Sequence, residues 1–251
     1  MFDTLLVQPM TNILVLFYSL IPYHDFGIAV IFLTVFIRLI LWPLQSKQLH
    51  NQKALNKIQP EVKKIQDKYK NDPMKMNQMV TELYKEKEVN PLSSCLPSLL
   101  QLPIMIALFY AILKFKDPNY INLTDHAQGI WAQLYGWVQN LGFVKETLAN
   151  SFSTNFIGLV DLAKPNTIIA ILAGAVQFIQ TKMMMPKKQA KDDPQAQTMN
   201  IMLYLFPLMA VYIGYKFPAA LPLYWIVNSL IAVLQQYLVM HHDIEVLEES
   251  K

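Results

Sequence analysis

A lone arginine lies within one of the most apolar stretches of the chain, with other polar residues at helical spacing around it. The stretch Phe26–Leu44 has 19 residues and is apolar except for Thr34 and Arg38. At about 1.5 Å per residue, a helix of this length just crosses a hydrocarbon core of about 30 Å, and Arg38 would lie about 18 Å from one end. Thr34 precedes Arg38 by one helical turn and Gln45 follows it by two, so the three share one face. Because a charge inside lipid costs about 2.5 to 17 kcal/mol, this face needs polar surroundings.

Two interpretations of Arg38 are open. The side chain can extend along the helix and reach the nearer membrane surface, which is about 9 Å away at the same rise per residue. Alternatively, several spans surround a water-filled polar cavity that holds Arg38. The second interpretation is favoured because other apolar segments also carry polar residues at helical spacing, and these are Ser98, Gln101, Gln177, Tyr224 and Asn228. In such a cavity we expect Arg38 to be hydrogen-bonded to neutral groups such as Gln101 and Thr34.

The sequence contains no motif that would predict catalysis. There is no glycine-rich phosphate loop, no HExxH and no Ser/His pair at a spacing that suits nucleophilic chemistry. The apolar segments contain no Asp, Glu or His, which argues against proton-driven transport and metal catalysis. The single cysteine, Cys95, excludes a disulfide framework. We therefore expect a protein that is not an enzyme and binds no cofactor or metal, with a cavity suited to polar peptide.

The apolar residues come in blocks, which indicates an integral membrane protein. Hydrophobic residues make up 53% of the 251 residues, and the mean hydropathy is +0.26. The predicted fold class is an all-α polytopic membrane protein with five transmembrane helices. The five predicted spans are Phe26–Leu44, Leu96–Leu113, Thr167–Met185, Asn200–Tyr215 and Leu221–Met240.

Lysine placement predicts which loops face the cytoplasm. The loop after the first span, residues 46–90, has ten Lys against six acidic residues, and the positive-inside rule makes it cytoplasmic. A second cytoplasmic loop is then expected at 186–199 and a cytoplasmic tail at 241–251, with Cys95 at the cytoplasmic end of the second span. Residues 114–165 become external, with short helices on the outer leaflet. Residues 1–25 are expected to form an external interfacial helix, because Pro9 and a narrow polar face disfavour a clean span.

The Lys-rich loop carries two apolar repeats at helical spacing. They are separated at Asn71-Asp72-Pro73, which predicts a tight turn between two helices. We expect an antiparallel helical hairpin. Its seam is formed by Leu55, Ile58, Val62, Ile65 and Tyr69 on one helix and Met76, Met79, Val80, Leu83 and Tyr84 on the other.

Four segments make the sequence similar to a known family. These are RLILWPLQSKQ from Arg38, QPEVKKIQDKYKNDPMKMNQ from Gln59, NPLSSCLPSLLQLPI from Asn90 and FPAALPLYWIVNSLIAVLQQ from Phe217. Together they resemble the YidC/Oxa/Alb family of membrane protein insertases, in its short bacterial form without the large periplasmic domain. The resemblance covers the five predicted spans in order and the hairpin between the first two.

The resemblance implies a hydrophilic groove that opens to the cytoplasm and the lipid and is closed to the outside. It places Arg38, Thr34, Gln101 and Trp225 at this groove, with Gln177 matching a looser motif, and Tyr224 and Asn228 lie on the same predicted face as Trp225. The implied function is to receive nascent membrane proteins and help them to insert into the bacterial cell membrane, alone or with the Sec translocon.

Further implied partners are the ribosome, the signal recognition particle machinery and the lipid bilayer, with no direct nucleic-acid substrate. The short acidic tail argues against ribosome contact through the tail. The other function class left open is a small-solute transporter or channel with an Arg-centred polar cavity, which predicts an internal repeat. No such repeat is visible in the sequence.

Overall fold

The computed structural model describes residues 1–90, 96–115, 117, 129–150, 152–185 and 194–249, with the side chains of 96–100, 150, 194–199 and 240–249 left out. The described chain is mostly helical, as predicted. In order, its elements are η1 (Asp3–Val7), α1 (Gln8–Leu20), η2 (Pro22–His24), α2 (Phe26–Lys68), α3 (Pro73–Glu86), α4 (Leu96–Lys114), α5 (Gly129–Gln133), α6 (Gly136–Gln139), α7 (Gly142–Asn150), β1 (Asn155–Phe156), β2 (Val160–Asp161), α8 (Thr167–Met184), α9 (Pro194–Lys216) and α10 (Ala220–Glu249).

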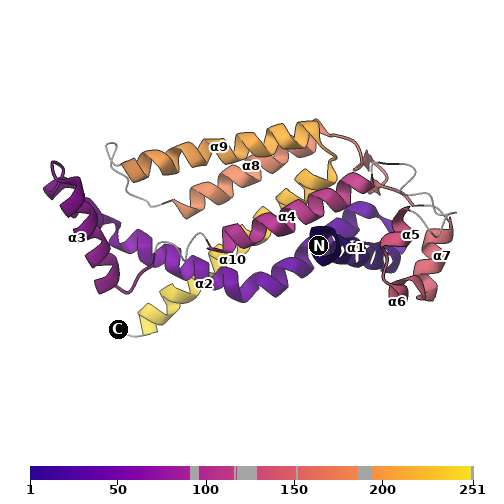
Figure 1. Ribbon diagram of the computed structural model, residues 1–251, viewed down its shortest axis with the longest axis horizontal. Coiled ribbons are helices and arrows are strands. Elements are labelled where there is room, and N and C mark those ends of the chain that lie inside the picture. The colour runs from indigo at the N-terminus through magenta and orange to yellow at the C-terminus, as the bar shows by residue number, and fades with distance from the viewer. Residues whose placement is uncertain (91–95, 116, 118–128, 151, 186–193, 250–251) are drawn as a thin grey trace.

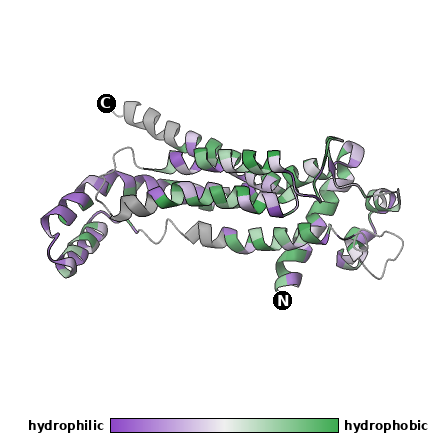
Figure 2. Ribbon diagram, turned by 90° about the horizontal axis from the view of Figure 1, so that it is seen from above, coloured by the Kyte–Doolittle hydropathy of each residue, from purple (hydrophilic) through white to green (hydrophobic). Residues whose placement is uncertain are grey.

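The long helices run roughly along the long axis of the molecule (Figure 1). The short helices α5 to α7 lie at one end, and α3 and the C-terminus lie at the other. Hydrophobic residues dominate the middle of the molecule, whereas the end that carries α3 is mainly hydrophilic (Figure 2). This division is the one expected of a membrane protein that exposes a polar domain on one side.

Three helices of the described chain are long and apolar enough to cross a membrane. They are α2, α8 and the Ala220–Val239 part of α10, and Gln101–Lys114 of α4 forms a shorter apolar helix. Helix α9 has 23 residues, longer than the 16-residue span expected there, because it begins at Pro194. All five predicted spans are helical, but the count of five transmembrane helices remains a prediction.

Side-chain caps fix the start of three helices. The Asp25 side chain accepts a hydrogen bond from the Ile28 amide at the start of α2, over 2.9 Å. At the start of α3, the Asp72 side chain accepts a hydrogen bond from the Lys75 amide over 3.1 Å. At the start of α8, the Asn166 side chain accepts one from the Ile169 amide, also over 3.1 Å. Asp and Asn are favoured at this position because their oxygen satisfies an amide that has no partner within the helix.

Helix α2 is continuous from the predicted first span into the predicted cytoplasmic hairpin. It runs for 43 residues through Pro43 and Pro60 without an end near Leu44, where the first span was expected to stop. Helix α3 then folds back along the second half of α2 (Figure 1). The seam between them buries Leu55, Ile58, Val62 and Leu83, as the apolar repeats predicted. The cytoplasmic position of this hairpin remains a prediction, and Cys95 lies outside the described residues.

The N-terminal helix α1 packs against α2, α4, α5 and α7. Three residues of its polar face, Thr11, Asn12 and Ser19, are buried within the protein, and the position of α1 at the membrane surface remains a prediction. Asn12 donates to the Gln133 carbonyl over 2.9 Å and accepts from the Tyr135 amide over 2.7 Å. The polar face thus joins α1 to the segment between α5 and α6.

Residues 129–162 form three short helices and a β-hairpin. The short helices were expected, but the antiparallel strand pair β1–β2 was not. Each strand has only two residues, which is too short to show an alternating pattern in the sequence. Phe152 stacks on Tyr18 and Phe115, which ties this segment to α1 and α4. Next to it, the amides of Ala219 and Ala220 donate to the carbonyls of Lys164 and Leu162, over 2.9 and 3.1 Å. This end of the helical bundle is therefore closed by aromatic packing and backbone hydrogen bonds.

Small residues let α8 and α9 approach closely. A Cβ on Gly174 would overlap Val211 and lie 3.0 Å from the Pro207 carbonyl oxygen. A Cβ on Gly214 would lie 2.8 Å from the Cβ of Ala170. Gln177 and Thr181 follow Ala170 and Gly174 at helical spacing on the same helix, and they line the cavity described below.

Candidate functional site

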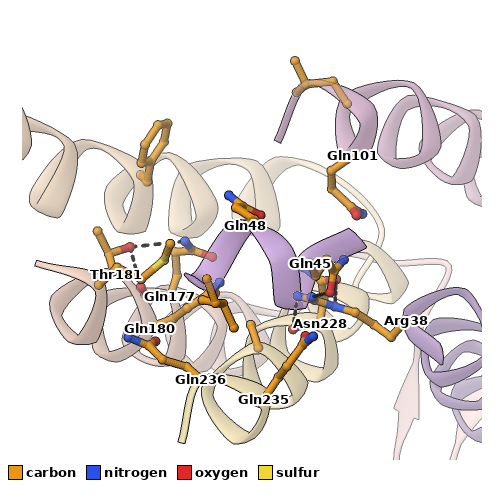
Figure 3. Close-up of a pocket in the computed structure, with 15 residues that line it drawn as sticks. Arg38, Gln45, Gln48, Gln101, Gln177, Gln180, Thr181, Asn228, Gln235 and Gln236 are labelled. Carbon is orange, nitrogen blue, oxygen red and sulfur yellow. Dashed lines mark hydrogen bonds between the residues drawn. The ribbon is translucent and has the colours of Figure 1, made fainter. Parts of the chain in front are cut away.

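A polar cavity lies between α2, α4, α8 and α10, with Phe206 of α9 at its wall (Figure 3). Its volume is about 330 Å³. Most of its polar lining consists of side-chain amides. The lining residues are Arg38, Gln45, Gln48, Leu49, Gln101, Leu102, Gln177, Gln180, Thr181, Met184, Phe206, Asn228, Ala232, Gln235 and Gln236.

Arg38 is 7% exposed and is held by α10 and by its own helix. Its Nε donates to Asn228 Oδ1 over 2.7 Å, and Nη2 donates to the Asn228 carbonyl over 2.6 Å. Nη1 donates to Gln45 Oε1, the polar residue two turns along the predicted stripe. Within the described part of the chain, no carboxylate oxygen lies within 4.0 Å of the guanidinium. The cation is therefore solvated by neutral acceptors only.

The expected partners of Arg38 differ from the observed ones. Thr34 Oγ1 donates to the Val30 carbonyl of its own helix over 2.7 Å, and Arg38 donates instead to Asn228 and Gln45. The Gln101 amide donates to the hydroxyl of Tyr224. The observed partner on another helix is Asn228 of α10, which offers Arg38 both a side-chain acceptor and a main-chain acceptor. Helical spacing does not predict such a contact between distant segments.

The α8 side of the cavity has its own hydrogen bonds. Ser229 of α10 donates to Gln177 Oε1 over 3.1 Å, and Thr181 Oγ1 donates to the Gln177 carbonyl over 2.9 Å. The neighbouring Gln180 presents a buried Oε1 for which the described structure has no hydrogen-bond donor. An acceptor buried without a partner is costly to stability.

Two further glutamines connect helices at the same level. Gln235 is 1% exposed and donates to the Trp42 carbonyl and to Ser46 Oγ, over 3.1 and 2.9 Å. Gln236 donates to the Met183 carbonyl at the end of α8, over 2.7 Å. These bonds fix α10 against α2 on one side and against α8 on the other, so they set the width of the cavity.

Four of the seven residues predicted for the site line the cavity, and these are Arg38, Gln101, Gln177 and Asn228. Thr34, Tyr224 and Trp225 are not among the residues that line it, although Tyr224 is bonded to Gln101. Gln48, Gln180 and Gln236 were not predicted as site residues. Their signal is the recurrence of glutamine at the ends of apolar segments, since Gln48 lies three residues after Gln45, Gln180 three residues after Gln177, and Gln236 directly after Gln235.

The chemistry of this lining is hydrogen bonding around one positive charge. Side-chain amides donate and accept at once, and a guanidinium has five N–H donors. In the part of the chain whose residues are described, no three His, Cys, Asp or Glu side chains group in a way that could hold a metal ion. The cavity is thus suited to binding polar or acidic peptide groups.

Comparison with known proteins places this arrangement in a family. Residues 16–245 match the family described as the 60Kd inner membrane protein. The chain is 37% identical over 217 residues to the membrane protein insertase YidC of Clostridium tetani, covering 86% of this chain and 82% of that protein. The chain belongs to the YidC family of membrane protein insertases.

Other YidC relatives support the same assignment over most of the chain. The membrane protein insertase YidC of Fusobacterium nucleatum is 36% identical over 216 residues, covering 86% of each chain. The membrane protein insertase MisCA of Bacillus subtilis is 31% identical over 247 residues, covering 97% of this chain and 80% of its own. Membership of the YidC family, together with the apolar helices, makes this chain a bacterial membrane protein.

Proposed function

We propose that this chain is a membrane protein insertase that receives nascent membrane proteins in the Arg38 cavity and releases them laterally into the bilayer. The observation that carries the proposal is the buried Arg38 guanidinium, whose partners among the described residues are all neutral acceptors. Its three hydrogen bonds to described residues use three of five N–H groups, so two remain for an incoming segment. A carboxylate on that segment would gain a charge-assisted contact in surroundings of lower dielectric than water.

The amide lining supports the same role. A polypeptide that enters a membrane carries unpaired backbone N–H and C=O groups, which are costly to bury without partners. The glutamines of the cavity offer both donors and acceptors. Because these contacts are individually weak, a client held by them can still leave toward lipid.

The same proposal includes contacts with other components of membrane protein insertion. Insertion proceeds alone or with the Sec translocon, and the hairpin of α2 and α3 is the contact for the translocon or for the ribosome and signal recognition particle machinery. The hairpin suits this role because its outer faces are charged and Met74 on α3 is 86% exposed. No catalytic step is part of this function.

Insertion assays with matched clients test the groove charge. Clients that differ only in an acidic or a neutral translocated tail are compared in cells that contain equal amounts of each insertase variant. Arg38→Lys keeps the positive charge and is expected to keep most activity, whereas Arg38→Ala is expected to fail mainly for acidic tails. Equal loss for both tails, or no loss for either, would contradict a role for the groove charge.

A further inference from the structure

Two turns with unusual backbone conformation lie together at the N-terminal end of α2. Tyr23 and His24, just before α2, have φ angles of 65° and 49°. Ile157 and Gly158, in the turn between β1 and β2, have φ angles of 53° and 69°. A positive φ is uncommon outside glycine, and it is a clear outlier for a bulky or β-branched residue. Residues of both turns line one cavity of about 430 Å³, so the two turns are neighbours in space.

A single carboxylate fastens the two turns. Asp25 Oδ1 accepts from the Ile28 amide as the cap of α2, and Oδ2 accepts from the Ile157 amide. The β-hairpin is further fixed by Phe156, whose ring occupies the space that a Cβ on Gly27 would need. The hairpin is therefore held at the level of the first turn of α2.

Three large side chains of these turns are highly exposed, beside the exposed His24. Tyr23 is 99% exposed, Leu159 is 85% exposed and Ile157 is 63% exposed. In water, a turn with two positive φ angles usually has Asn, Asp or Gly at both positions, because these residues tolerate the conformation and are well hydrated. Ile157 satisfies neither condition. Strain of this kind persists at functional sites, where another interaction compensates for it.

The depth of the two turns identifies the compensating interaction. Phe26–Leu44 is long enough to cross the hydrocarbon core once, at about 1.5 Å per residue against about 30 Å. Gly27, which contacts Phe156, is therefore at the boundary between hydrocarbon and head groups. The exposed side chains of the turns lie at the same level, where tyrosine and aliphatic side chains are favoured by lipid.

We propose that Tyr23, Ile157 and Leu159 form a lipid anchor that inserts into the interfacial layer of the bilayer leaflet at the N-terminal end of α2. The charges at the base of the hairpin stay in water, since Lys164 is 78% exposed and pairs with Asp161 over 2.9 Å. The anchor fixes the depth of α2, and with it the depth of Arg38, about 18 Å further along the helix. It does not depend on the proposed insertase function.

Spin labels in pure lipid vesicles test the anchor. In a Cys95→Ser background, Leu159→Cys and Tyr23→Cys are each labelled with a nitroxide, and Lys164→Cys serves as the matched control at the base of the same hairpin. The purified protein is reconstituted into vesicles of phosphatidylethanolamine and phosphatidylglycerol. Collision of each label with oxygen, which concentrates in lipid, and with a nickel chelate, which stays in water, is measured by electron paramagnetic resonance.

The anchor predicts several-fold lower collision with the nickel chelate at residues 159 and 23 than at 164, together with higher collision with oxygen. Nickel access at either position equal to that at 164 would overturn the proposal. Because the vesicles contain no other protein, a label shielded from both reagents would mean contact between copies of this chain and would overturn it equally. The two labels lie on different turns, so misfolding of one variant leaves the other test intact.

Discussion

Asn228 is the main hydrogen-bond partner of the Arg38 guanidinium. It supplies two of the three acceptors that hold Arg38, through Oδ1 at 2.7 Å and its carbonyl at 2.6 Å. Asp and Leu have nearly the shape of Asn, so they separate charge from geometry. Asn228→Asp keeps the acceptor and adds a negative charge that neutralises Arg38.

We expect Asn228→Asp to remove the preference for acidic client tails while leaving folding nearly unchanged, because a buried ion pair contributes little net stability. The comparison variant Asn228→Leu removes the side-chain acceptor from a charged donor and should lower the free energy of unfolding by about 1.5 to 3 kcal/mol. Insertion of paired acidic and neutral clients, with thermal unfolding in detergent, measures both effects. An unaltered acidic preference in Asn228→Asp would mean that Arg38 does not read client charge.

The ionised Asp161 carboxylate, at the end of the bundle that carries the β-hairpin, makes the free energy of unfolding depend on pH in the acid range. Partial burial acts to raise its pKa, but hydrogen bonds from Thr154, Lys164 and the Ala163 amide outweigh burial, so the net pKa lies below the usual value of 3.8. A carboxylate with a depressed pKa stabilises the fold at pH above its unfolded value, and this contribution disappears as pH falls through the folded pKa. The relevant window is therefore below about pH 4.

We expect Asp161→Asn to lower the unfolding temperature at pH 7, and the difference from the wild type to narrow as the pH falls below about 4. The difference narrows because the stabilisation by the ionised Asp161 is lost as the pH falls through the depressed pKa of the folded protein. Thermal unfolding in detergent at several pH values measures this difference. A gap that stays constant down to pH 3 would show that the Asp161 charge does not contribute.

At this residue scale, helical spacing predicted which residues share a helix face with Arg38. The 3.6-residue repeat places Arg38 and Gln45 on one helix face, and the structure bonds them to each other. The same repeat indicated Asn228 on another helix, but not that it would bind Arg38. Contacts between distant helices depend on their relative rotation, which periodicity within each helix does not determine. Thr34 illustrates this limit, since its hydroxyl bonds within its own helix.

At the scale of helices, close packing of α8 on α9 depends on Gly174. The variant Gly174→Ala would place a methyl group against Val211 and near the Pro207 carbonyl. Overpacking of this kind costs about 1 to 3 kcal/mol. Gly142→Ala is the matched control, because a Cβ there would have no atom within 4 Å.

Unfolding in detergent should show Gly174→Ala to be less stable than the wild type and Gly142→Ala to be nearly equal to it. The double variant Gly174→Ala with Val211→Ala should recover part of the loss, since the second change removes the clashing methyl group. A lack of recovery would mean that the loss arises from α8 alone and not from its contact with α9.

Helix boundaries were predicted less well than helix positions. The turn at Asn71-Asp72-Pro73 was found because Asp72 caps α3 and Pro73 begins it. The predicted span Phe26–Leu44 did not show how far its helix extends, since α2 has 43 residues and passes through Pro43 and Pro60. A change from apolar to polar composition marks a change of surroundings and does not end a helix. The β1–β2 pair was missed because two-residue strands carry no periodic signal.

At the scale of the whole molecule, the two ends differ in chemistry. One end carries α3 and the hydrophilic part of α2, and the other carries α5 to α7 and the β-hairpin (Figures 1 and 2). Helix α2 spans the distance between them, at about 1.5 Å per residue over its 43 residues. If the apolar middle lies in the bilayer, the two ends lie on opposite sides of the membrane, with the Lys-rich end in the cytoplasm.

Two single-cysteine variants test this orientation in a Cys95→Ser background. Met74 on α3 is 86% exposed and Trp137 on α6 is 62% exposed, so either position accepts a cysteine at the surface. A membrane-impermeant maleimide should label Trp137→Cys only in intact cells and Met74→Cys only in inverted vesicles. Permeabilised membranes serve as the control that both thiols can react. Labelling of both positions from one side would rule out a membrane crossing between the two ends, and a reversed pattern would contradict the positive-inside assignment, because the Lys-rich hairpin would then lie outside.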